Sequence, residues 1–172
     1  MRSLPFVLFL ALSLVACGGS DSSDTSASES STTETTTEQT VSSDEVDQTV
    51  TIQPQGNQMK YKQTEFTVSP GETVRLVFEN VATSPSMVHN VVFVNSTEDE
   101  VFRRVGEAGT RAGSTNDYIP EDDAILAHTP VAQPGETVEV TFTVPEETGD
   151  YGYVCTYPGH WATMQGTMKV RG

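Results

Sequence analysis

The chain has 172 residues, with 24 Asp and Glu against 9 Lys and Arg, and a formal net charge of -15. This length suits one domain, because a domain typically takes about 100–200 residues. So few cations exclude a nucleic-acid-binding class, since that binding depends on neutralising phosphates with Lys and Arg. A charged partner is therefore expected to be basic.

The N-terminus has the three parts of a secretory signal. Arg2 supplies the positive start, residues 4–15 are mostly apolar, and Ala16 precedes Cys17. The apolar part is shorter than the ~20 residues that a membrane-spanning helix needs. The tetrapeptide Leu-Val-Ala-Cys that ends at this cysteine resembles the bacterial lipoprotein signal. We therefore predict that residues 1–16 are a signal peptide and that Cys17 is lipidated; the alternative is an ordinary signal with an incidental cysteine.

Residues 17–48 differ in composition from the rest of the chain. From position 18 to 48, 16 residues are Ser or Thr and 8 are Asp or Glu, and none is basic or aromatic. Such a segment buries too little apolar surface to offset the entropy of ordering. We expect a disordered tether between the lipid anchor and a domain at 49–172. The domain would be extracytoplasmic, held by the lipid to the periplasmic or cell-surface side of a membrane.

Residues 49–172 are predicted to form an all-β domain. Apolar and polar residues alternate in 49–53, 73–79 and 137–144, so each strand has one buried and one exposed face. This pattern favours a Greek-key sandwich of antiparallel sheets. The other expected strands are 59–68, 89–94, 151–155 and 165–171.

The alternation stops between Asn95 and Pro130. Within this stretch, residues 98–105 carry apolar side chains at helical spacing after an acidic first turn. We predict a short helix on a crossover connection between strands.

Metal-binding residue types gather near the C-terminus. Cys155, His160 and Met164 fall within ten residues, between two predicted strands, and His89 opens another strand. A thiolate, two imidazoles and a thioether are the ligands of a trigonal blue-copper site with a long axial bond. The alternative is a buried core cysteine with unrelated histidines. We predict one copper ion per domain, cycling between Cu(I) and Cu(II).

With these residues, the domain resembles the cupredoxins, or blue copper proteins, of the azurin and auracyanin type. The loop Cys155-Thr-Tyr-Pro-Gly-His160, followed by Met164, is nearly the azurin copper loop, and His89-Asn90 and 123–129 also match. The resemblance implies a cupredoxin Greek-key sandwich. It also implies His89, Cys155 and His160 as equatorial ligands and Met164 as the axial one.

The same resemblance assigns roles to neighbouring residues. Asn90 would hydrogen-bond across the site, and the backbone N–H groups of Asn90 and Tyr157 would bond the thiolate sulfur and tune its potential. Val88 stands where azurins usually have a glycine whose carbonyl approaches copper, so its carbonyl is a candidate contact. His128 aligns with a family histidine that is not a ligand.

Four protein ligands leave no coordination position for a substrate, so we expect one-electron transfer and no enzymatic activity. Electrons would pass through the solvent-facing edge of His160. The partners implied by the family are redox proteins such as c-type cytochromes, oxidases or reaction centres, and the chain is expected to be a monomer. The predicted apolar docking patch around His160 comprises Pro85, Met87, Tyr157, Pro158, Trp161 and Ala162.

Two other functions use similar residues. A copper-buffering or copper-delivery lipoprotein would hold exchangeable metal, often with clustered Met or His, whereas the five Met here are scattered. A Cys-His hydrolase would need an accessible thiolate and an oxyanion hole. The short loop between Cys155 and His160 does not suggest one.

Overall fold

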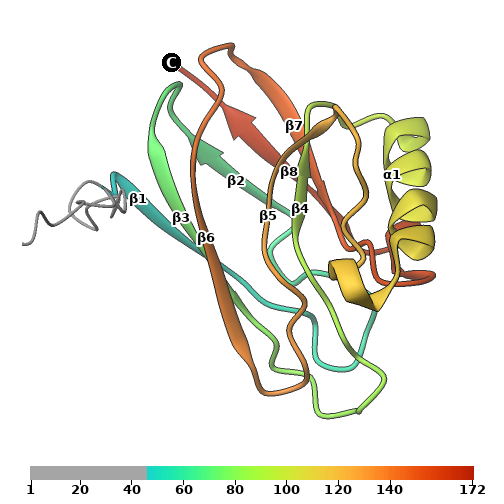
Figure 1. The fold of residues 1–172 in the computed structure, drawn as a ribbon. Helices are drawn as coiled ribbons and strands as arrows, with labels where there is room; N and C mark the ends of the chain where they lie inside the picture. The colour runs from blue at the N-terminus through green and yellow to red at the C-terminus, as the bar shows by residue number, and fades with distance from the viewer. Residues whose placement is uncertain (1–45) are drawn as a thin grey trace, which may run out of the picture. The chain divides into compact units, whose positions relative to one another are not determined.

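The computed structural model describes residues 46–172, which form two β-sheets with one α-helix beside them (Figure 1). The predicted signal peptide, Cys17 and nearly all of the predicted tether lie outside the described residues. Within 46–172, no helix is both long and apolar enough to cross a membrane.

The described part of the chain has eight strands, one α-helix and two short 3-10 helices. A three-stranded sheet has the order β1-β3-β6, and a five-stranded sheet has the order β2-β8-β7-β4-β5. The elements are β1 (Gln48–Ile52), β2 (Glu65–Val68), β3 (Thr73–Glu79), β4 (Val92–Val94), α1 (Asp99–Ala112), η1 (Ser114–Asn116), β5 (Ile125–His128), β6 (Thr137–Thr143), β7 (Gly149–Val154), η2 (His160–Ala162) and β8 (Gln165–Val170).

The alternating pattern of the strands produces the core between the two sheets. On β3, Val74, Leu76 and Phe78 are fully buried, while the residues between them are partly exposed. Phe93 on β4 faces Phe142 on β6, with ring centroids 4.8 Å apart, so the two sheets share one apolar layer. The predicted all-β sandwich is confirmed.

The prediction of purely antiparallel sheets is wrong for two strand pairs. β1 runs parallel to β3, and β2 runs parallel to β8, whereas the other pairs are antiparallel. Alternation identifies the buried face of a strand but not the direction of its neighbour, which is why the sequence did not reveal these pairs.

Some strand limits differ from the prediction. The expected strand at 59–68 is regular only over β2, because Tyr61 instead makes an isolated bridge to Pro54. The expected strand at 89–94 is regular only over β4, and His89 bridges Ala132. Strand β5 was not predicted at all.

The helix α1 is longer than the predicted 98–105. It continues to Ala112 through Gly106 and Gly109, two residues that weaken a helix when it is considered alone. Its buried residues Phe102 and Val105 pack on β4 and β7 of the five-stranded sheet. The helix therefore covers the face of that sheet opposite the central core, as Figure 1 shows.

Candidate metal centre

Three predicted ligands meet at one end of the sandwich. The Nδ1 atoms of His89 and His160 are 3.0 Å apart, and the Cys155 sulfur lies 3.6 Å from Nδ1 of His160 and 3.9 Å from that of His89. All three side chains are buried. Within 46–172, no other group of three or more His, Cys, Asp or Glu is arranged to hold a metal ion.

Backbone pairing fixes the position of His89. Its N–H donates to the Ala132 carbonyl at 3.2 Å, and its carbonyl accepts from the Ala132 N–H at 2.8 Å. The buried Asn80 amide donates to the carbonyls of Met87 and Ala132. The loop that contains Met87 and leads to His89 is thus held to the segment before β6.

A tight turn brings His160 back towards Cys155. The His160 N–H donates to the Tyr157 carbonyl at 3.0 Å, and Gly159 adopts φ 81 and ψ -11, the left-handed conformation that this turn needs. The Cys155 N–H donates to the Met164 carbonyl, and the Met164 N–H donates to the His160 carbonyl. The Met164 side chain is fully buried, so all four predicted ligands have buried side chains.

Asn90 links the two segments that carry the predicted ligands. Its Oδ1 accepts from the Thr156 N–H at 2.9 Å, and its Nδ2 donates to Thr156 Oγ1 at 2.9 Å and to the Asp117 carbonyl at 3.1 Å. The Asn90 carbonyl accepts from the Tyr61 hydroxyl at 2.6 Å. Tyr61 and Asp117 are contacts that the sequence analysis missed.

Burial controls the protonation of the three ligand side chains. It lowers the pKa of His89 to about 4, with a contribution from the nearby His160, and it also lowers the pKa of His160. Both imidazoles are therefore neutral at pH 7 and have lone pairs to offer a metal. With the Nδ1 atom of His89 facing the cluster as a ligand, the ring proton is on Nε2, which is buried with no hydrogen-bond partner among the described residues.

Burial and hydrogen bonding shift the pKa of the Cys155 thiol in opposite directions. Burial raises its pKa to about 12, while hydrogen bonds from the backbone N–H groups of Asn90 and Tyr157 act in the other direction. A bound cation favours the thiolate, because metal ligands must be deprotonated. A soft sulfur and two neutral imidazoles in a buried site fit copper.

Other residues singled out from the sequence lie outside this cluster. His128 is exposed on β5 and is not part of it. The Val88 side chain is buried.

The residues of the expected docking patch differ in exposure. Three are exposed, Pro85, Pro158 and Ala162, and three are partly buried, Met87, Tyr157 and Trp161.

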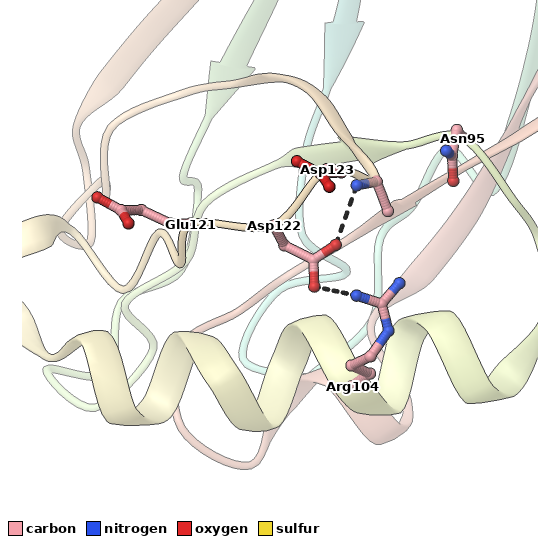
Figure 2. A pocket seen from close by; sticks show the side chains of 6 residues that line it. Asn95, Arg104, Glu121, Asp122 and Asp123 are labelled. Carbon is pink, nitrogen blue, oxygen red and sulfur yellow. Dashed lines mark hydrogen bonds and ion pairs between the residues drawn. The ribbon is translucent and has the colours of Figure 1, made fainter.

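An open hollow of about 640 Å³ contains none of the four predicted ligands. Asp122 lines it, accepts a hydrogen bond from the Ala124 N–H at 2.9 Å and pairs with Arg104 of α1 (Figure 2). Glu121 and Asp123 complete an acidic rim. The hollow lies between α1 and the segment before β5, and the ion pair of Arg104 with Asp122 connects the two.

Comparisons with known proteins agree with this geometry. Residues 48–171 match the family model of copper-binding proteins of the plastocyanin/azurin family. Auracyanin-A of Chloroflexus aurantiacus is 37% identical over 171 residues, covering 99% of this chain and 96% of the relative. Azurin of Alcaligenes faecalis is 37% identical over 109 residues, covering 62% of this chain and 78% of the relative.

Solved structures show the same likeness. The structure of auracyanin A, a "blue" copper protein from Chloroflexus aurantiacus, superposes with a TM-score of 0.66 at 40% identity, covering 72% of this chain and 98% of that one. Reduced auracyanin from Roseiflexus castenholzii gives a TM-score of 0.66 at 37% identity, covering 72% and 97%.

Proposed function

The chain belongs to the plastocyanin/azurin family of copper-binding proteins, and we propose that it is a one-electron carrier. The proposed ligands of its copper are His89, Cys155, His160 and Met164. The observation that carries this proposal is the buried cluster in which both Nδ1 atoms and the cysteine sulfur face one another. When bound, copper supplies a couple between Cu(I) and Cu(II) that takes up or releases one electron.

The protein residues would hold this site nearly unchanged while an electron passes. Asn90 ties the His89 segment to the loop after Cys155 through two hydrogen bonds with Thr156. The N–H groups of Asn90 and Tyr157 bond the sulfur and stabilise its negative charge. We also propose the Val88 backbone carbonyl as an additional contact of the copper, which a crystal structure of the copper-loaded protein would test.

His160 is the proposed exit and entry point for electrons. It is 4% exposed, and its ring lies beside that of Tyr157, with ring centroids 4.9 Å apart. An apolar patch around this nearly buried ring, as we propose, favours a small, transient interface of the kind that redox partners form.

The two alternative functions fit less well. A Cys-His hydrolase needs a reachable thiolate, whereas Cys155 is fully buried and its pKa is raised to about 12. A copper-delivery protein needs a metal that exchanges readily, whereas these ligands are buried and braced by Asn90.

We further propose that lipid on Cys17 and a tether at 17–48 hold the carrier at a membrane outside the cytoplasm. The match to auracyanin-A extends over 99% of this chain, which supports a similar N-terminal layout. The proposed partners are membrane or extracytoplasmic redox proteins: c-type cytochromes, oxidases or reaction centres. The photosynthetic source named for the auracyanin A structure makes a reaction-centre pathway one to test first.

Visible absorption of the copper-loaded full chain tests the proposed function. An electron carrier gives one strongly bound copper per chain and an intense blue band that disappears on reduction. Weak colour with copper that a mild chelator removes quickly would support the buffering or delivery function instead. No colour and no copper retention would contradict both metal functions.

A further inference from the structure

The residues that directly follow two proposed ligands both contact α1. Thr156 follows Cys155, and Trp161 follows His160. On the helix, Gly106 and Gly109 are both buried and lie one turn apart, so they share a face. The side chain of Trp161 lies against Gly106, and that of Thr156 lies against Gly109.

Both helix positions lack room for any side chain. A Cβ placed on Gly106 would be 2.2 Å from Cγ and 2.3 Å from Cβ of Trp161. A Cβ on Gly109 would be 2.7 Å from Cβ of Thr156 and 2.6 Å from the carbonyl oxygen of Tyr118. These distances are far below van der Waals contact, so the helix backbone itself forms the surface on which the loop rests.

The turn after α1 adds a third contact with the site. Asp117 and Tyr118 have φ values of 50° and 57°, a left-handed conformation that costs energy for residues with a Cβ. This conformation places the Asp117 carbonyl on the Asn90 amide at 3.1 Å. The Tyr118 ring contacts the Tyr157 ring at a centroid distance of 5.0 Å.

We propose that α1 is a positioning element of the metal centre, whose Gly106 and Gly109 hold the residues after His160 and Cys155 and so set the spacing of these ligands before metal binds. This inference rests on the proposed ligand set. It assigns the helix a role beyond covering the five-stranded sheet, because two of its buried positions contact the loop of the site.

Substitution Gly106→Ala in the full chain tests the proposal. Alanine normally strengthens a helix relative to glycine, whereas here it must push Trp161 away. In the metal-free protein, we expect the amides of residues 156–164 to exchange with solvent about tenfold faster, as overpacking opens the loop locally. In the copper-loaded protein, we expect a changed copper hyperfine splitting in the EPR spectrum. Arg111→Ala, at an exposed position on the same helix, is the control and should change neither readout.

A double-mutant cycle with Trp161→Gly identifies the contact responsible. If Trp161 transmits the effect, Gly106→Ala should have little further influence on loop exchange in the Trp161→Gly background. Additive effects, or wild-type exchange and EPR in Gly106→Ala, would overturn the proposal. If Gly106→Ala does not fold, Trp161→Gly alone should accelerate loop exchange, and wild-type exchange in that variant would overturn it.

The metal-free measurement separates this inference from the proposed function. A wild-type chain without blue copper would refute the electron-carrier function, while the exchange rates would still decide whether α1 positions the loop.

Discussion

Asn90 and Thr156, 66 positions apart, are joined by two hydrogen bonds of 2.9 Å that run in opposite directions. Both residues are fully buried. Asn90 follows His89, and Thr156 follows Cys155. This pair, which does not itself bind the metal, therefore fixes the distance between the two proposed ligands His89 and Cys155.

Replacing Asn90 with alanine should therefore destabilise the domain strongly. The change leaves the Thr156 N–H and the Asp117 carbonyl without a partner, at a cost of about 2–4 kcal/mol in the free energy of unfolding. Denaturant unfolding of the metal-free chain measures it. Asn116→Ala, which removes one exposed hydrogen bond of 3.3 Å, is the matched control and should cost under about 0.5 kcal/mol. Equal effects of the two changes would show that the Asn90 bonds do not brace the site.

The ligand set could be predicted because most of its chemistry is local in sequence. Cys155, His160 and Met164 share one short loop, and only His89 had to be added from elsewhere. The contacts that hold the ligands were not predictable in the same way. The sequence around Asp117 and Tyr61 does not indicate that the Asp117 carbonyl and the Tyr61 hydroxyl form hydrogen bonds with Asn90. These bonds depend on how segments distant in sequence fold together.

The fold shows the same division between local and long-range information. Strongly alternating strands such as β3 were predicted correctly, whereas β5 has only Ile125 and Ala127 partly buried and sits at a sheet edge. The length of α1 was underestimated because Gly106 and Gly109 weaken a helix in isolation. Their close approach to the ligand loop, which explains these glycines, is a tertiary contact.

The ion pair between Arg104 and Asp122 should make stability depend on acid pH. Burial raises the pKa of Asp122, but the Ala124 N–H and Arg104 outweigh it, so the pKa ends below its usual 3.8. A carboxyl with a lowered pKa stabilises the fold above its unfolded pKa, and this contribution disappears as pH falls through the folded value. Arg104→Gln should cost about 1 kcal/mol at pH 7 and almost nothing near pH 2.

Urea unfolding at several pH values checks this prediction. Arg111→Gln, at an exposed position of the same helix and without an ion pair among the described residues, serves as the control and should show no comparable pH-dependent difference. An Arg104→Gln effect of the same size at pH 2 and pH 7 would mean that the helix contact, and not the ionised carboxylate, is responsible.

The proposed boundary between tether and domain predicts the result of truncation. Deletion of residues 1–45 should leave a folded, copper-binding domain whose unfolding temperature equals that of the mature chain. Deletion of residues 1–48 should be less stable, by about 1 kcal/mol, because the Asp47 N–H and carboxylate both bond Thr73. Thermal unfolding of both truncations measures this. A markedly lower temperature for the shorter deletion would show that the tether packs on the domain.

The proposed docking patch around His160 predicts how the protein docks. Ala162→Glu, at an exposed position of this patch, should strongly slow electron exchange with a basic cytochrome. Thr141→Glu, exposed on β6 in the other sheet, is the control and should not slow it. Stopped-flow rates across a salt series measure the separate contribution of the acidic surface. A rate that falls steeply with salt supports electrostatic steering, and a flat profile limits the interaction to apolar contact.

A redox titration of the copper-loaded full chain, followed by its visible band, tests whether the protein is a one-electron carrier. We expect a single reversible one-electron transition, with the blue band lost on reduction and regained on oxidation. Cys155→Ser should lack the band, because the colour arises from the bond between copper and thiolate, while His128→Ala should titrate like the wild type. A strong blue band in Cys155→Ser would contradict Cys155 as the copper ligand, and a wild-type chain whose copper cannot be reduced and reoxidised would contradict one-electron transfer.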